Sequence, residues 1–226
     1  MTIQEKLQSL RARIRNAATR SHRQASEIKL VLVTKNVLLP QIKEAFQAGA
    51  RDFGENRVQE LVSKKPELDG SIHWHFIGRL QTNKVKRLLE GADESLLIHS
   101  LDRMELAEEI QKQAQKKERT VDALIQVNTT GETTKAGFRP EEVEKTVQQI
   151  QKMNRIQLQG FMTIGPLNGS ERSIRKNFAS LRQIRDELSR SLPVLKELSM
   201  GMSSDFEWAV EEGATIVRIG TALFGE

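Results

Sequence analysis

The sequence contains no cysteine and no tyrosine among its 226 residues, and aromatic side chains make up only 4% of it. Without cysteine, the chain can form no disulfide, no thiolate nucleophile and no cysteine-ligated zinc site. Its longest apolar runs, such as residues 30–33, are far too short to span a bilayer. The first 17 residues have neither an apolar core nor a small-residue cleavage site, so they do not resemble a secretory signal. We therefore expect a soluble cytoplasmic protein.

The chain is basic, with a formal net charge of +5. Its basic residues gather in three stretches, at residues 11–15, 84–87 and 112–117. None of these stretches contains an aromatic side chain, and charge alone is a weak sign of nucleic-acid binding. We expect solvated helix faces there, and no nucleic-acid partner.

A repeating pattern of amphipathic helix, glycine break and short apolar strand runs along the chain. Glycine precedes alanine at Gly49, Gly91 and Gly213, where we expect it to end helices in the left-handed conformation. Such alternation is typical of parallel β/α architecture. We predict eight strands, near residues 30–34, 51–53, 73–77, 96–99, 122–128, 157–163, 194–199 and 215–219, with helices between them, for example at 103–117 and 174–190.

Eight strands are the number that a closed TIM-type (β/α)8 barrel requires. We predict one such barrel over residues 1–226, with an additional helix at 3–24 before the first strand. The length also permits two small domains. An open doubly wound sheet is the main alternative, but it normally carries a glycine-rich turn after its first strand. Residues 33–37 read Val-Thr-Lys-Asn-Val, and GxGxxG occurs nowhere in the chain, so the barrel is favoured.

Ligands of such barrels bind at the carboxyl ends of the strands, and Lys35 lies at the end of the first one. By strand alternation, Val31, Val33 and Lys35 share one face. A lysine at the barrel mouth is expected to lose hydration, which lowers the pKa of its amine and frees it to form an imine. The alternative is a lysine that extends from the strand end into solvent.

Arg218 lies within the last predicted strand, where both faces are buried. A buried guanidinium needs a partner, which is either a carboxylate of the protein or a bound ligand. Gly220 allows a close approach of backbone, and Thr221 adds a hydroxyl at the strand end.

Two further segments carry polar groups at strand ends. Ser204 and Glu207 form an expected capping box, and a helix start after strand seven suits a phosphate. Asn56 follows strand two, where its amide either contacts a ligand or caps the next helix. His73 and His75 share a face of strand three, but no third ligand is spaced to complete a metal site. We expect them to be structural.

Five segments together resemble the YggS/PROSC-type family of pyridoxal 5′-phosphate (PLP) homeostasis proteins. They are FGENRVQE (53–60), WHFIGRLQTNK (74–84), IHSLD (98–102), LSMGMSSDFEWAV (198–210) and VRIGTALFG (217–225). The likeness runs from about the first strand to the carboxyl terminus. It implies the barrel fold of the alanine racemase N-terminal domain and of the fold-type III decarboxylases.

The resemblance implies a cofactor site for PLP. Lys35 matches the lysine that forms the internal aldimine, although Asn36-Val37 departs from the Thr-Lys often seen after it. Arg218 matches the arginine at the pyridine nitrogen. The other matching positions are the phosphate cradle at Ser203, Gly220 and Thr221, its lining at Ser199 and Met202, and the ring neighbours Asn56 and Met162.

The resemblance also implies a role in PLP (vitamin B6) homeostasis and amino-acid metabolism, with no catalytic residue. A racemase or decarboxylase of this fold type remains the alternative, with Lys35 as its only evident base. A racemase needs a second base, usually a tyrosine from a further domain; the chain has no tyrosine and ends at Glu226, soon after the last predicted strand. A third possibility is an interaction protein that senses cofactor status. We expect a monomer that binds PLP and has PLP-dependent apo-enzymes as candidate partners.

Overall fold

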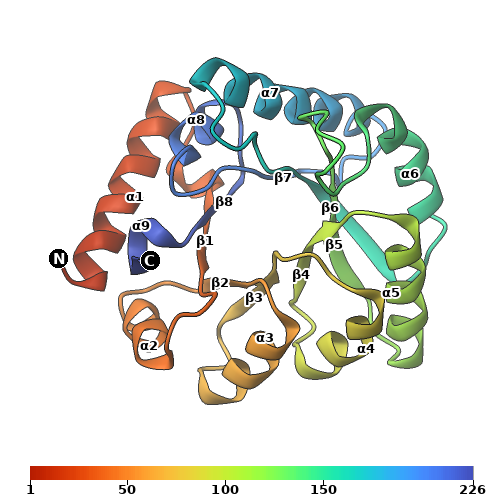
Figure 1. Cartoon of the computed structure of the whole chain (residues 1–226), viewed down its shortest axis with the longest axis horizontal. Helices are drawn as coiled ribbons and strands as arrows, with labels where there is room; N and C mark the ends of the chain where they lie inside the picture. The colour runs from red at the N-terminus through yellow and green to blue at the C-terminus, as the bar shows by residue number, and fades with distance from the viewer. Residues whose placement is uncertain (226) are drawn as a thin grey trace.

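The protein is a closed barrel of eight parallel strands, numbered in chain order around the barrel (Figure 1). The computed structural model describes residues 1–225. Pairing of Lys29–Leu32 with Ile216–Ile219 joins the last strand to the first and closes the barrel. The strands are β1 (Lys29–Val33), β2 (Asp52–Glu55), β3 (His73–Phe76), β4 (Leu97–Leu101), β5 (Val121–Gln126), β6 (Ile156–Met162), β7 (Glu197–Ser199) and β8 (Ile216–Ile219).

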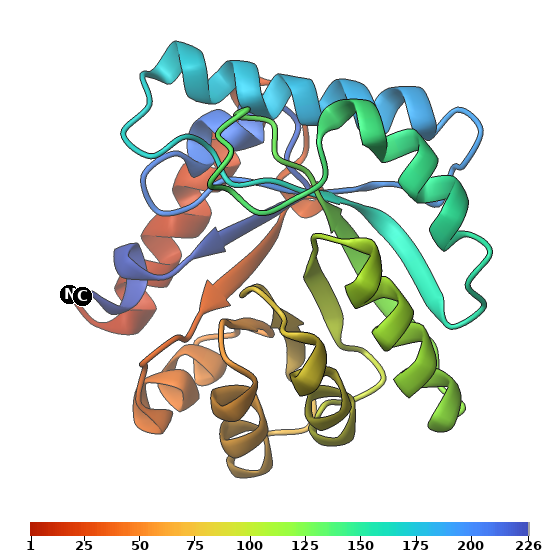
Figure 2. The same cartoon turned by 45° about the vertical axis from the view of Figure 1, so that its right-hand side comes forward.

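Helices surround the barrel on its outer face (Figures 1 and 2). Helix α1 precedes β1 and is started by a capping box, in which the Thr2 hydroxyl accepts from the Glu5 N–H and the Glu5 carboxylate accepts from the Thr2 N–H. The α-helices are α1 (Ile3–Arg20), α2 (Leu39–Gln47), α3 (Val58–Lys64), α4 (Thr82–Gly91), α5 (Met104–Lys116), α6 (Val143–Ile150), α7 (Glu171–Leu188), α8 (Phe206–Glu211) and α9 (Thr221–Phe224). No helix of residues 1–225 has the length and apolar character needed to cross a bilayer.

Strand alternation divides the apolar core into two parts. Outward-facing strand side chains, such as those of Leu32, Trp74 and Val217, pack beneath the helices. The barrel interior holds a smaller apolar cluster, made of Val31, Leu97, Leu124, Met162 and Ile216. The remaining interior positions include polar and charged side chains, which is unusual for buried sites unless they are paired.

The structure confirms the predicted barrel and its strands, but it corrects three local expectations. Gly49 and Gly213 have the expected positive φ of 87° and 103°, whereas Gly91 is simply the last residue of α4. A Cβ on Gly91 would lie 2.5 Å from the Val62 side chain, so this glycine lets α3 and α4 approach each other. The first helix ends at Arg20 instead of residue 24.

The third correction concerns the predicted capping box after strand seven. Helix α8 begins at Phe206 with Asp205, and not Ser204, as its N-cap. The Asp205 carboxylate accepts instead from the Met202 N–H, at 2.6 Å, within the preceding turn. The helix therefore starts one residue later than predicted, and Ser203 and Ser204 belong to the preceding loop.

Candidate functional site

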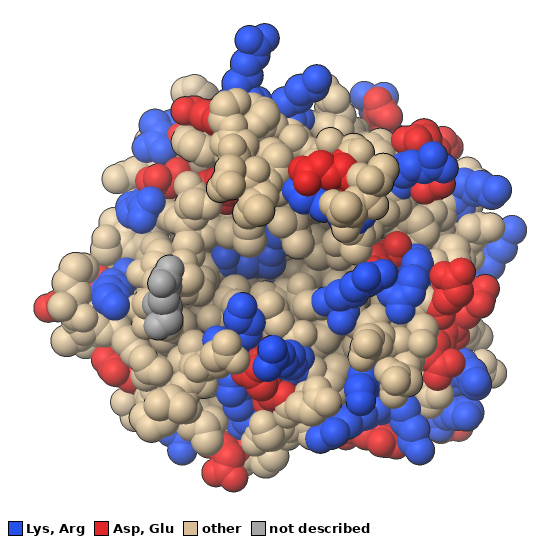
Figure 3. Space-filling model, in the orientation of Figure 1, with Lys and Arg blue, Asp and Glu red and all other residues tan. Residues whose placement is uncertain are grey.

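A cavity of about 680 Å³ opens at the carboxyl ends of β1, β2 and β8. Figure 3 views the molecule from this end and shows a hollow near its centre, with basic side chains in and beside it. Seven of the nine residues predicted to bind the cofactor line this cavity: Lys35, Asn56, Met202, Ser203, Arg218, Gly220 and Thr221. The cavity is therefore assembled from strand ends that are far apart in the sequence.

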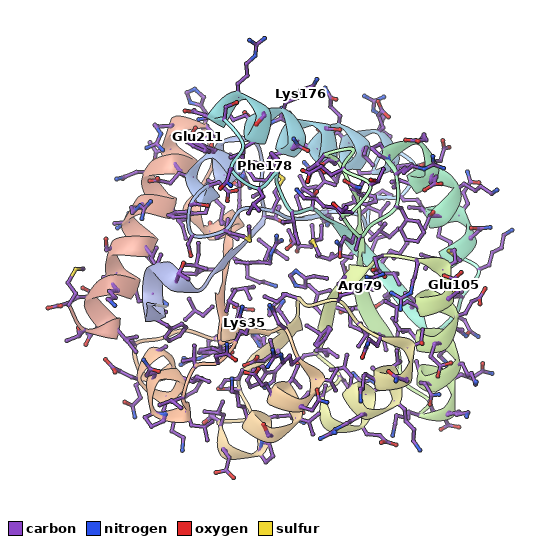
Figure 4. The ribbon with its side chains drawn as sticks, in the orientation of Figure 1. Lys35, Arg79, Glu105, Lys176, Phe178 and Glu211 are labelled. Carbon is purple, nitrogen blue, oxygen red and sulfur yellow. The ribbon has the colours of Figure 1, made fainter. Side chains whose placement is uncertain are left out.

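Lys35 lies in a tight turn directly after β1, on the cavity wall (Figure 4). The Val37 N–H donates to the Thr34 carbonyl at 2.9 Å and closes the turn. Asn36 adopts a positive φ of 59°, a conformation that asparagine tolerates better than most residues. Lys35 follows the strand, as predicted, but its side chain is solvent-exposed, whereas a lysine that loses hydration was expected.

Helix α3 and strand β2 hold this turn through a buried ion cluster. The Lys64 ammonium donates to the Thr34 carbonyl and to carboxylates of Glu55 and Glu60, at 2.8, 2.8 and 2.9 Å. Glu60 also accepts from the Asn36 N–H at 2.9 Å. The two residues flanking Lys35 are thereby fixed by their backbone. We call Thr34, Glu55, Glu60 and Lys64 the turn clamp.

Glu55, like Thr34, has no exposed surface. Burial raises the pKa of its carboxyl, although hydrogen bonds from Lys64 and Thr34 act in the opposite direction. One of its oxygens, Oε2, has no hydrogen-bond partner in the described chain. The carboxylate therefore depends strongly on Lys64.

Arg218 reaches the opposite side of the cavity from β8 and is only 5% exposed. Its guanidinium donates to the Ser199 hydroxyl at 2.6 Å and to the Thr163 carbonyl at 2.9 Å. No carboxylate of the described residues forms an ion pair with it, and burial lowers its pKa to about 10. Among residues 1–225 the nearby Asp205 carboxylate raises the pKa of Arg218 against burial, but no carboxylate hydrogen-bonds to the guanidinium, so Arg218 keeps N–H groups for a ligand.

The loops after β7 and β8 meet beside Arg218. The Ser203 hydroxyl accepts from the Ala222 N–H at 3.2 Å and ties the two loops together. Gly220 approaches β1 so closely that a Cβ would lie 3.3 Å from Val33. Thr221 follows as an exposed residue on the cavity wall. These loops bring hydroxyl groups together at the place where barrels often bind phosphate.

Asn56 lines the cavity from the end of β2. Helix α3 starts at Val58 with Arg57 as N-cap, so Asn56 does not have the capping role considered as an alternative. A Cβ on Gly78 would lie 2.1 Å from the Asn56 carbonyl oxygen, which shows how tightly the neighbouring loop packs on it. Its position leaves the amide available to a ligand in the cavity.

Two predicted residues, Ser199 and Met162, lie below the cavity and do not line it. Met162 is 1% exposed and belongs to the apolar cluster inside the barrel. The Ser199 side chain is fully buried, and its hydroxyl contacts Arg218 and His99 instead of lining a phosphate cradle.

Asp52 and His99, which support Arg218 from below together with His75, were not predicted from the sequence, and His75 was expected only to be structural. His99 hydrogen-bonds to Ser199 at 2.8 Å and to His75 at 2.9 Å, and His75 bonds to Asp52 at 3.1 Å. Alternation along β3 and β4 was the available signal, since it points His75 and His99 inward. No group of three metal-ligating side chains converges anywhere in residues 1–225.

Comparisons with known proteins agree with this geometry. The family model for the alanine racemase N-terminal domain matches residues 6–226. A pyridoxal phosphate homeostasis protein of Aquifex aeolicus is 47% identical over 224 residues, covering 98% of this chain and 97% of that protein. The structure of PipY from Synechococcus elongatus with PLP bound has a TM-score of 0.86 at 37% identity, covering 99% of this chain and 100% of that one.

An alanine racemase of Clostridium difficile shares the fold alone. Its TM-score is 0.78 at 16% identity, and the match covers all of this chain but only 56% of the racemase. The homeostasis proteins, in contrast, match along almost their whole length: the relative from Pseudomonas aeruginosa is 38% identical over 99% of this chain and 95% of its own. The chain therefore belongs to the family of pyridoxal phosphate homeostasis proteins.

Proposed function

We propose that this protein binds PLP in the cavity and takes part in the homeostasis of that cofactor. The observation that carries the proposal is Arg218, a buried cation that faces the cavity without a carboxylate partner in the described chain. A neutral or anionic ligand atom is what such a group requires. PLP offers a pyridine nitrogen and a phosphate, and a relative of 37% identity has been solved with PLP bound.

The lining residues fit PLP in three places. PLP supplies an aldehyde, which condenses with a primary amine with loss of water, and Lys35 provides the amine in the cavity wall. Arg218 would donate to the ring nitrogen, and Asn56 would contact the ring. Hydroxyl and backbone groups of the β7 and β8 loops would bind the phosphate, chiefly through Ser203, Gly220 and Thr221.

We further propose that the protein carries or regulates PLP and has no catalytic reaction of its own. An arginine at the pyridine nitrogen disfavours ring protonation and weakens the ring as an electron sink. The sequence contains no tyrosine to act as an opposed base. Lys35 is exposed, which suits loading and exchange with other amines more than chemistry protected from water. Relatives named for PLP homeostasis support the same role.

Residues 1–226 are proposed to act as one domain, because all eight strands belong to a single closed barrel. The partners that receive PLP would then be PLP-dependent apo-enzymes that approach the mouth of this barrel.

Borohydride reduction followed by mass spectrometry tests the PLP site. We expect one reduced PLP adduct on Lys35 in the PLP-loaded protein and none in Lys35→Ala. Lys84→Ala is the matched control and should keep the adduct, because Lys84 lies outside the cavity. An adduct mapped to Lys84 or Lys135 in the unmutated protein would show that the site is assigned wrongly.

Loss of the α-deuterium from labelled L- and D-alanine tests the absence of racemase activity. Removing one of two opposed bases typically costs about 10²–10⁴-fold in rate. We expect the PLP-loaded protein to stay far below an ordinary turnover of about 1 s⁻¹. Turnover at that level, lost in Lys35→Ala, would make the protein an enzyme.

A further inference from the structure

A continuous chain of hydrogen bonds runs through the barrel interior, from the cavity to the amino end of β2. It starts at Arg218 and continues through Ser199 (2.6 Å), His99 (2.8 Å), His75 (2.9 Å) and Asp52 (3.1 Å). The residues come from five different strands, and the three in the middle have at most 2% of their surface exposed. We call Ser199, His99, His75 and Asp52 the relay.

The Arg218 end of the relay is compatible with one direction of hydrogen bonding. A guanidinium only donates, so the Ser199 oxygen accepts from Arg218, and the Ser199 hydroxyl has its own proton to donate to His99 Nδ1. His99 then carries its proton on Nε2 and donates to His75 Nδ1. His75 in turn donates from Nε2 to the Asp52 carboxylate.

The Asp52 end of the relay requires these directions. An ionised carboxylate only accepts, which requires a proton on His75 Nε2. A neutral His75 then accepts at Nδ1, and this requires a proton on His99 Nε2. Burial lowers the pKa of both imidazoles, which favours the neutral forms that this arrangement needs. The Asp52 end therefore specifies one proton arrangement, and the Arg218 end is compatible with it.

The relay also separates the charge of Arg218 from that of Asp52. A carboxylate in direct contact would fix Arg218 but neutralise it, leaving little attraction for a ligand. Here the Ser199 oxygen and the Thr163 carbonyl fix two N–H groups of Arg218, and Asp52 lies two imidazoles and a hydroxyl away. The guanidinium is thus oriented without a carboxylate in hydrogen-bond contact, since Asp205 acts on it only through space.

We propose that Asp52, His75, His99 and Ser199 are positioning residues that aim Arg218 at the ring nitrogen of bound PLP while leaving its charge free for the ligand. This rests on the proposed function, because it takes Arg218 to be the partner of the ring nitrogen. None of the four is a catalytic residue, since Arg218 lies between them and the cavity.

The proton arrangement is tested without PLP, by nitrogen NMR of histidine-labelled apoprotein. The chain has four histidines, and single substitutions assign their signals. We expect His75 and His99 each to carry one proton, on Nε2. A proton on Nδ1 of either ring would overturn the relay whether or not PLP binds. In Asp52→Asn, whose amide both donates and accepts, we expect mixed tautomers at His75 and His99; unchanged tautomers would contradict the proposal.

Affinity and the ring-nitrogen signal of ¹⁵N-labelled PLP test the effect on the cofactor. Ser199→Ala removes the acceptor beneath Arg218, and PLP should bind about 10-fold more weakly. The ¹⁵N chemical shift of the PLP ring nitrogen should move towards the value of a nitrogen without a hydrogen bond. Borohydride reduction should still yield the Lys35 adduct. Asp122→Asn is the matched control for Asp52→Asn. It also replaces a carboxylate by an amide, at the amino end of β5, where Gln159 and not the relay contacts it.

The outcomes separate the two proposals. Missing Lys35 adducts in the unmutated protein contradict the proposed function. Intact adducts with an unchanged affinity and ring-nitrogen shift in Ser199→Ala contradict the relay. If Ser199→Ala does not fold, Asp52→Asn decides: a several-fold weaker affinity with altered tautomers supports the proposal, and unchanged values of both refute it.

Discussion

Lys35 and Arg218 present positive charge to the same cavity from very different surroundings. Lys35 is exposed, so water screens its charge, whereas Arg218 is 5% exposed and its charge acts in a medium of low dielectric. The buried arginine therefore orients a ligand more strongly, while the exposed lysine remains open to covalent attachment and release. This division suits the proposed role of binding and releasing PLP.

The hydroxyl of Thr221 allows a test of the phosphate site. Thr221→Val keeps the shape of the side chain but removes a donor to the anion, which we expect to cost about 1–2 kcal/mol of PLP binding free energy. Pyridoxal lacks the phosphate, so it should bind the unmutated protein far more weakly than PLP does. Its affinity should be the same for the unmutated protein and for Thr221→Val. Titration with both vitamers checks this. Thr120→Val, an exposed threonine far along the chain, is the control.

Single residues differ in how far the sequence revealed them. Lys35, Arg218 and Thr221 follow or end apolar strands, so alternation and the barrel rule placed them at the mouth. Ser199 was assigned to the phosphate, because a sequence does not show that an inward serine at a strand end lies beneath a neighbouring arginine. The contact depends on how β7 and β8 are staggered, and that stagger is a property of the closed barrel.

Helix α3 is the element that holds the Lys35 turn, through Lys64 and Glu60. Lys64→Met would leave the Glu55 carboxylate buried without its cation, since Glu55 has no exposed surface. Breaking such a pair typically costs about 3 kcal/mol, so we expect a loss of that order in the free energy of unfolding. We also expect slower attachment of PLP to Lys35, because the turn loses its support.

Urea unfolding and the rate of PLP attachment measure these two effects. Lys65→Met is the matched control, because the adjacent Lys65 pairs with the half-exposed Asp93 on the surface. A surface pair contributes little, so this variant should change stability by less than about 1 kcal/mol. Equal losses in the two variants would mean that the turn clamp has no special role.

Strands and helices with a clear hydrophobic periodicity were predicted well, but the residues at which they begin and end were predicted less well. The eight strands appear where apolar runs alternate with amphipathic helices. The capping box at Ser204 failed because Asp205 has a competing use in the turn at Met202. Gly91 was misassigned because a glycine needed for close packing of α3 against α4 looks the same in sequence as one needed for a positive φ.

The barrel as a whole combines apolar side chains on its outer face, under the helices, with the hydrogen-bonded relay in its interior. Five strands contribute to the arrangement of Arg218 and the relay, and the residues involved extend from Asp52 to Arg218 along the chain. Alternation points His75 and His99 inward, but no local pattern shows that the five residues meet, because each has an ordinary place on its own strand. Closure of the barrel brings them together, and it also buries two histidines whose titration affects the stability of the entire molecule.

Those histidines predict a loss of stability just below neutral pH. Burial lowers the pKa of His75 and His99 in the folded state, so the unfolded chain, with a histidine pKa near 6.5, takes up protons that the folded chain refuses. Each group thus stabilises the fold fully above about pH 6.5, and this contribution declines as the pH falls towards the folded pKa. The slope is at most about 1.4 kcal/mol per pH unit for each histidine. Glu55 and Asp205, whose pKa values burial raises, act in the opposite direction from about pH 4 upwards, so the informative quantity is a difference between proteins.

Urea unfolding between about pH 5.5 and 7.5 tests this. The free energy of unfolding should depend less steeply on pH in His99→Gln than in the unmutated protein. An identical slope in the two proteins would mean that the buried histidines are not held neutral by the fold.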